Sequence, residues 1–197
     1  MTALVFSFVF TFLLLAAALH RLFEPTRKRI FGIPPAVTGA ILCAALALVP
    51  IGGLPSCRWL ASLYANFSMP LAVLLFCVVW RSATGRTLLR DKDIVAFWAF
   101  GLLAGLVLYP MALGVGPVDP YAWGWGSGWL FIVLGAISAA MFFCGNRLGF
   151  ALLLAVVGWH LCFIESTNIW DYVVDPAYFI ASAAAIIARL LRKVCQC

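Results

Sequence analysis

Two stretches of the sequence hold most of the residues that could do chemistry, because each mixes carboxylates with tryptophan and tyrosine. They run over residues 117–129 and 165–176, and both contain Val-Asp-Pro. Carboxylates can accept hydrogen bonds or move protons, and tryptophan rings offer flat contact surfaces. The sequence therefore indicates a binding face for a lipid, a glycan or a protein partner. Its candidate residues are Arg58, Asp119, Tyr121, Trp123, Trp125, His160, Glu165, Trp170, Asp171, Tyr172 and Asp175.

The same residues have a structural interpretation. Aspartate followed by proline favours the start of a helix, with aspartate as the N-cap and proline at the first position. Tryptophan and tyrosine also gather where a membrane meets water. Both interpretations stay open. Because an unpaired carboxylate near hydrocarbon is costly, we expect at least one of Asp119, Asp171 and Asp175 to contact Arg58, His160 or a helix N-terminus. We also expect the two loops to pack together.

Histidines and catalytic motifs offer little. The two histidines, His20 and His160, fall near opposite faces of a predicted hydrocarbon layer about 30 Å thick, so one chain cannot hold a haem between them. There is no HExxH motif, and the run that begins at Trp125 has tryptophan where a GxSG nucleophile motif needs glycine. We predict no catalytic residue and no cofactor.

The seven cysteines do not form a CxxC pair. Four of them fall in apolar segments, where cysteine behaves as a small hydrophobic residue, and Cys57 is predicted in a loop. Cys195 and Cys197 form a terminal CxC whose modification is left open. We therefore predict no metal site. The four in apolar segments are Cys43, Cys77, Cys144 and Cys162.

The composition explains this scarcity of polar chemistry. Of 197 residues, 65% are hydrophobic and 10% charged, and the mean hydropathy is +1.09. A soluble domain has about 45–50% apolar and about 25% charged residues, so this chain lacks the polar side chains to cover a water-exposed surface. We predict an integral membrane protein of a bacterial cytoplasmic (inner) membrane, with residues 1–197 as a single membrane domain.

The apolar segments predict an all-α, polytopic transmembrane helix bundle with short loops. A helix needs about 20 apolar residues to cross the bilayer core. The seventh segment carries Arg189, and the fifth and sixth are short, so six spans remain an alternative to seven. Gly101 and Gly105 form a GxxxG pair, which favours a close helix contact within the chain, with oligomerisation as the alternative. The segments are 2–20, 33–50, 60–80, 94–115, 129–145, 148–164 and 177–191.

The distribution of charge predicts the orientation. With the N-terminus outside, twelve of the thirteen lysines and arginines fall on the inner side and only Arg58 falls outside. Four of the seven acids then lie outside. The positive-inside rule predicts this arrangement, with the C-terminus inside. The net charge of +6 is therefore a topology signal and does not indicate nucleic-acid binding.

Two segments resemble a known family. After a basic turn, residues 32–40 read Gly-Ile-Pro-Pro-Ala-Val-Thr-Gly-Ala, which resembles the start of the second span of glutamate/sodium symporters. The third segment, with Pro70 and then Arg81 to Arg90, is loosely similar to the next span of such carriers. The glycine-rich broken-helix motif that forms the binding site of that family has no counterpart here. The resemblance implies a small-solute or ion transporter, expected as a dimer.

Three functions therefore compete. The leading one is a non-catalytic membrane subunit or interaction partner of a larger assembly, since no Asp, Glu or Lys lies in the middle third of any predicted span, where coupled carriers need such a group. The alternative is the transporter. The third is an enzyme acting on a lipid-linked substrate at the outer leaflet, which requires His160 within hydrogen-bond reach of the outer acids or of the substrate. The expected partners are the bilayer and a protein partner or second copy, without nucleic acid.

Overall fold

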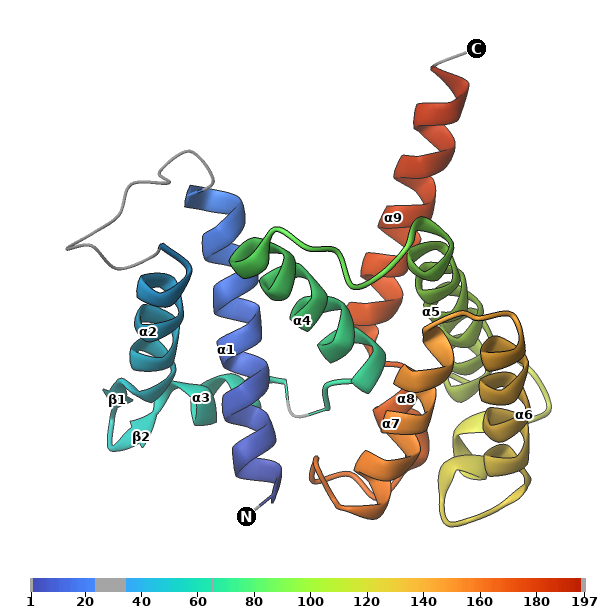
Figure 1. Ribbon diagram of the computed structural model, residues 1–197. Coiled ribbons are helices and arrows are strands. Elements are labelled where there is room, and N and C mark those ends of the chain that lie inside the picture. The colour runs from blue at the N-terminus through green and yellow to red at the C-terminus, as the bar shows by residue number, and fades with distance from the viewer. Residues whose placement is uncertain (1, 24–34, 65, 196–197) are drawn as a thin grey trace. The chain divides into compact units, whose positions relative to one another are not determined.

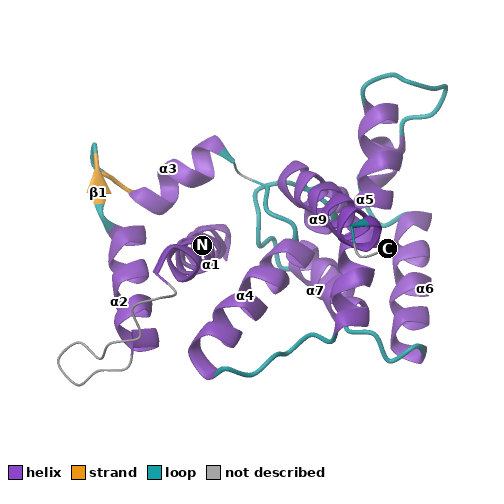
Figure 2. Cartoon of the chain, turned by 90° about the horizontal axis from the view of Figure 1, so that it is seen from above, coloured by secondary structure: helices purple, strands orange, loops and turns teal. Residues whose placement is uncertain are grey.

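The computed structural model describes residues 2–23, 35–64 and 66–195 (Figure 1). Within these ranges the chain is helical, and its only strands form a short hairpin of β1 (Pro50–Ile51) and β2 (Leu54–Pro55) (Figure 2). The prediction of an all-α chain is confirmed at this level. Most of the basic turn before the second predicted span, with the first residues of the symporter-like run, and also Cys197 lie outside the described residues.

One helix in the described ranges, α5 (Asp91–Ala112), is long and apolar enough to cross a bilayer, judged by its length and composition. At about 1.5 Å per residue, a helix of about 17 residues reaches about 25 Å, which is less than the bilayer core of about 30 Å. The number of spans therefore stays a prediction. The shorter apolar helices are Thr2–Ala18, Thr38–Leu48, Met69–Thr84, Trp129–Phe143 and Leu148–His160.

The chain forms two compact units. The first takes its described residues from Met1–Asn66, Ala72–Leu88 and Phe163–Glu165, and the second takes them from Phe67–Leu71, Leu89–Cys162 and Ser166–Cys197. We describe each unit by itself.

In the first unit, α1 (Thr2–Phe23) packs against α2 (Pro35–Leu48) and α3 (Ser56–Leu63). Cys57 lies in α3 and is 2% exposed, so its predicted place in a loop is wrong.

The prediction of one helix over residues 60–80 is also wrong. α3 ends at Leu63, and a new helix, α4 (Met69–Thr84), begins six residues later. The sequence between them carries Asn66 and Ser68, which favour turns and caps over helix interiors, and Pro70 then occupies the first turn of α4. The apolar run is therefore split.

The second unit contains α5, the 3₁₀ turn η1 (Pro120–Gly124), α6 (Trp129–Phe143), α7 (Leu148–His160), α8 (Ile169–Val173) and α9 (Pro176–Val194). α5 packs against α9, and α6 packs against α7. Cys144 and Cys162 lie just beyond the ends of α6 and α7 and are exposed, so their placement inside apolar helices is wrong.

Close packing joins α5 to α9. A Cβ atom at Gly101 would lie 2.7 Å from the ring of Tyr178 and would also overlap the hydroxyl of Ser182. A Cβ atom at Gly105 would overlap the ring of Phe179. The hydroxyl of Tyr178 donates a hydrogen bond of 2.5 Å to the carbonyl of Phe97. The prediction that this GxxxG pair packs within the chain is confirmed.

The register of these contacts makes α5 and α9 antiparallel. Gly101 lies against Ser182, whereas the ring of Tyr109, two turns later, packs at a tilt against that of Phe179, with ring centroids 5.3 Å apart. The start of α5 and the end of α9 therefore lie at the same end of the unit (Figure 1).

The second unit therefore separates its charges. One end carries the cations that flank the start of α5, the α6–α7 turn and the last turns of α9. The other end carries the acids of η1, α8 and the start of α9. The cations are Arg90, Lys92, Arg147, Arg189, Arg192 and Lys193, and the acids are Asp119, Asp171 and Asp175.

Candidate functional site

The two acidic, aromatic loops pack against each other in the second unit, as predicted. The indole N–H of Trp170 donates a hydrogen bond of 2.8 Å to the carbonyl of Pro120. The amide of Asn168 donates one of 2.9 Å to the carbonyl of Tyr121, and Asn168 also forms an isolated antiparallel bridge with Trp125. These contacts bind residues that lie about fifty positions apart in the sequence.

Asn168 is the centre of this contact, and sequence reasoning missed it. It is fully buried, and its side-chain oxygen caps α8 by accepting from the N–H of Trp170 at 3.0 Å. Gly124 makes room for it, because a Cβ atom there would overlap the Asn168 side chain. The signal was an asparagine one position before the apolar pair Ile169–Trp170, which is an N-cap pattern.

Both Val-Asp-Pro aspartates cap helices. Asp119 accepts from the N–H of Tyr121 at 2.9 Å, and Asp175 accepts from the N–H of Tyr178 at 2.9 Å. In each case the following proline takes the first helical positions. The expected contact of these acids with a helix N-terminus is confirmed.

Asp175 does more than cap α9. Its second carboxylate oxygen accepts from both the N–H and the hydroxyl of Ser68, at 2.9 and 2.5 Å, and the residue is fully buried. Asp175 therefore ties the start of α9 to the segment that leads into α4. Nothing in the sequence pairs these two residues, which lie 107 positions apart.

Asp171 lies in a partly buried polar cluster. The hydroxyl of Tyr121 donates a hydrogen bond of 3.1 Å to its carboxylate, and the hydroxyl of Ser166 also contacts it. Burial raises the pKa of Asp171, and the nearby charge of Asp175 adds to the rise, while the two hydroxyls oppose it. Burial and the charge of Asp171 together raise the pKa of Tyr121 to about 12.

This shift predicts a pH dependence. The pKa of Asp171 is higher in the folded state than in the unfolded state, so the folded protein holds this proton more tightly. The contribution of Asp171 to the free energy of unfolding therefore falls as the pH rises from its unfolded-state pKa through its folded-state pKa. Asp171→Asn should remove this contribution and flatten the acid side of the pH–stability profile. Unfolding in micelles followed by tryptophan fluorescence measures it. An identical slope in the variant would contradict the assignment.

Contacts are also described for three further candidate residues, Arg58, Glu165 and His160. Arg58 forms an ion pair of 3.8 Å with Glu165 in the first unit, and both side chains are well exposed, so the pair contributes little. His160 is exposed at the end of α7 and its ring lies 5.9 Å from that of Trp159. Among the described residues, His160 has no hydrogen bond and no ion pair. The expectation that His160 and Glu165 form one binding face with Asp119, Asp171 and Asp175 stays a prediction.

The aromatic residues divide into a buried and an exposed group. Trp170 is 8% exposed, and Tyr172 is fully buried and donates a hydrogen bond of 3.1 Å to the carbonyl of Ser166. Trp125 and Trp129 remain 57% and 51% exposed. Their rings pack against the edge of Tyr121 and against Trp123, the latter with ring centroids 4.7 Å apart.

The arrangement supplies a hydrogen-bonded loop pair with carboxylates, hydroxyls and exposed indole rings. It can hydrogen-bond or stack on a partner. In the part of the chain that the structure describes, no group of three or more His, Cys, Asp or Glu side chains could hold a metal ion. No family model matches the chain, and no curated protein and no solved structure matches it.

Proposed function

We propose that this chain is a non-catalytic, multi-pass integral membrane protein that serves as a subunit or interaction partner of a larger membrane assembly. The observation that carries the proposal is the band of exposed apolar side chains between the charged ends of the second unit. On α5, Leu103 is 63% exposed, Leu106 52% and Val107 47%. On α6, Ile132 is 74% exposed. An exposed apolar surface of this kind needs hydrocarbon or a protein partner to cover it.

The length of the band supports a membrane location. Over its 22 residues α5 rises about 33 Å, which is enough to cross a hydrocarbon core of about 30 Å. The acidic end beyond it carries exposed Trp125 and Trp129, as the interfacial belt of a membrane protein does. In this proposal the cationic end of the unit faces the cytoplasm.

The contacts of the buried acids support a structural role for them. Asp175 accepts three hydrogen bonds from main-chain and hydroxyl donors, and Asp171 accepts from two hydroxyls. Both lie at the end of the unit and not at the middle of α5, where a coupling carboxylate of a carrier is expected. This favours a subunit or partner over a transporter.

One observation keeps the transporter as the second candidate. Among the described residues, the buried hydroxyls of Tyr109 and Ser182, on α5 and α9, have no hydrogen-bond partner. Buried hydroxyls usually have one, and a polar solute passing along these helices would supply it. Solute or ion flux through reconstituted protein would support this candidate. The outer-leaflet enzyme gains no support from the exposed position of His160.

Thiol labelling tests the membrane crossing and its direction. Cys144 and Cys162 are exposed at opposite ends of the second unit, whereas buried Cys57 should be unreactive. In single-cysteine variants in intact cells, an impermeant maleimide should label Cys162, and it should label Cys144 and Cys195 only after the membrane is opened. The reverse pattern would overturn the orientation. Labelling of all three without opening the membrane would contradict the crossing.

Site-specific crosslinking tests the partner. A photoreactive residue at the exposed Leu103 or Leu106 should give a protein adduct of defined mass in native membranes, and one at Leu108, which is 2% exposed, should not. Lipid adducts alone at every exposed position of α5 and α6, together with a monomer in mild detergent, would contradict the assembly.

A further inference from the structure

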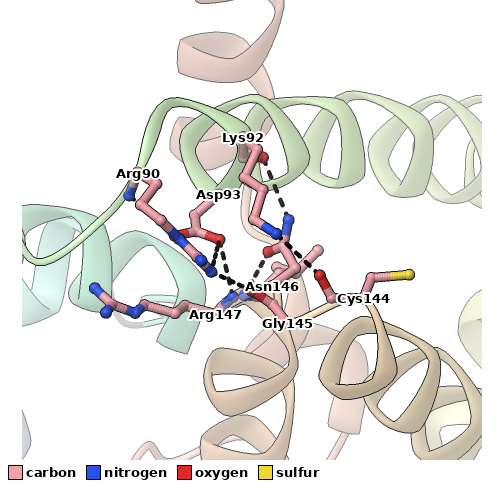
Figure 3. A network of polar contacts seen from close by, with 8 residues as sticks. Arg90, Lys92, Asp93, Cys144, Gly145, Asn146 and Arg147 are labelled. Carbon is pink, nitrogen blue, oxygen red and sulfur yellow. Dashed lines mark hydrogen bonds and ion pairs between the residues drawn. The ribbon is translucent and has the colours of Figure 1, made fainter.

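A network of polar contacts fixes the cationic end of the second unit (Figure 3). The fully buried carboxylate of Asp93 accepts from the N–H of Arg90 at 2.9 Å, from the Arg90 guanidinium at 3.1 Å and from the N–H of Arg147 at 3.2 Å. Asp93 therefore joins the start of α5 to the start of α7. The sequence alone did not indicate this network.

Two cations complete the junction by binding the end of α6. The ammonium of Lys92 donates a hydrogen bond of 3.0 Å to the carbonyl of Cys144, and the Arg90 guanidinium donates one to the carbonyl of Gly145. The last carbonyls of a helix lack intrahelical partners and carry partial negative charge, so cations are favourable there. The side chains of Arg90 and Lys92 therefore form hydrogen bonds within the protein.

Three further cations of this end, Arg147, Arg192 and Lys193, have exposed side chains. Arg147 is exposed, and its side chain runs away from the network that holds its main chain (Figure 3). Arg192 and Lys193 are exposed in the last turn of α9. In the described ranges none of these three side chains has a hydrogen bond or an ion pair. Six cations against Asp91 and Asp93 leave this end with a formal charge of +4.

We propose that this cationic end binds the phosphate of anionic phospholipid headgroups, with Arg147, Arg192 and Lys193 as the contacts. The inference rests on the membrane location proposed above. Guanidinium and ammonium groups are the donors that phosphate prefers, and the junction around Asp93 holds the main chain of Arg147 in place. The exposed apolar helices adjoin this end, so a lipid here would place its chains on α5 and α6 and its headgroup at the cations.

The test uses the full chain in neutral detergent micelles and compares phosphatidylglycerol, phosphatidylcholine and inorganic phosphate as probes. Native mass spectrometry measures how much protein carries bound lipid at each concentration. Phosphatidylglycerol should bind more tightly than phosphatidylcholine, and salt should weaken it. Removing one cation should lower the affinity about five-fold, which corresponds to about 1 kcal/mol per basic residue. The triple variant R147Q/R192Q/K193Q should therefore lose about 100-fold.

Two controls separate charge from structure. Arg58→Gln removes a cation of the first unit and should leave phosphatidylglycerol binding unchanged, and Arg147→Lys keeps the charge and should retain most of the affinity. Because the three substituted side chains are exposed, the unfolding midpoint without lipid should stay at the wild-type value.

Three results would overturn the inference. They are equal affinity for the two lipids, unchanged affinity in the triple variant, and full competition by inorganic phosphate at the lipid concentration, which would assign the site to a soluble anion. Extraction with alkaline carbonate distinguishes the underlying proposal. A protein that resists extraction but shows no lipid preference contradicts only the headgroup site, whereas a protein released by carbonate contradicts the membrane location.

Discussion

Asp175→Ala is expected to lower the free energy of unfolding by about 3–5 kcal/mol, which is a large part of the stability of an ordinary domain. The change removes the N-cap of α9 and leaves the N–H groups of Tyr178 and Ser68 without their acceptor in a buried place. Reversible unfolding in mixed micelles, followed by tryptophan fluorescence, measures the loss.

Asp119→Ala is the matched control, because Asp119 is the aspartate of the other Val-Asp-Pro tripeptide. Asp119 is exposed and accepts one hydrogen bond, from Tyr121, so its loss should cost about 1 kcal/mol or less. Equal costs at the two positions would contradict the special role of Asp175.

Asp175→Asn separates the two functions of this carboxylate. The asparagine oxygen can still accept from Tyr178, but its NH₂ group then faces the N–H of Ser68, so two donors meet. We expect the free energy of unfolding of the asparagine variant to lie between those of the wild type and the alanine variant. A fully stable asparagine variant would mean that the contact with Ser68 contributes nothing.

Gly105→Ala and Gly101→Ala are expected to destabilise the second unit by about 1–3 kcal/mol each, because the added methyl group overpacks a tight interface. At Gly105 it would meet the Cβ atom of Phe179 at 3.0 Å as well as its ring. Because the Cβ atom of Phe179 is fixed to the backbone of α9, the contact can be relieved only by shifting α9. Unfolding measurements on each variant check the prediction.

Gly135→Ala, in the middle of α6, is the control for glycine itself. A Cβ atom there would meet nothing within 4 Å, and alanine favours a helix over glycine by up to about 1 kcal/mol. This variant should be as stable as the wild type or more so. Stabilisation at all three positions would contradict the close α5–α9 contact.

Local chemistry made parts of the fold predictable. Asp119 and Asp175, each followed by proline, marked two helix starts, and Gly101 with Gly105 marked a helix contact. These signals lie within a few residues of one another in the sequence, so they need no knowledge of tertiary structure. The separation of charge within the second unit followed in the same way, from the order of apolar segments and cations.

Long-range partners could not be predicted from these signals. Asp175 finds Ser68, and Asp93 finds the N–H of Arg147, across 107 and 54 positions. Such pairs depend on how helices are placed in space and on their rotation about their axes. Arg58 is the one cation that the sequence assigns to the side of the outer acids, and the acid with which it pairs is Glu165, at the start of the second acidic stretch. Assignment to one side of the membrane does not specify which of several acids a cation contacts.

The hydrogen bonds of Asp93 also limit which substitutions this sequence can accept during evolution. Two of the donors to its carboxylate are main-chain N–H groups, at Arg90 and Arg147, and these remain whatever side chain those positions carry, proline excepted. Position 93, by contrast, must keep an acceptor. In sequences that diverge from this one, an acidic or amide residue at 93 should outlast the arginines. Retention of a cation at 147 would then reflect selection on the exposed guanidinium itself, independent of the junction.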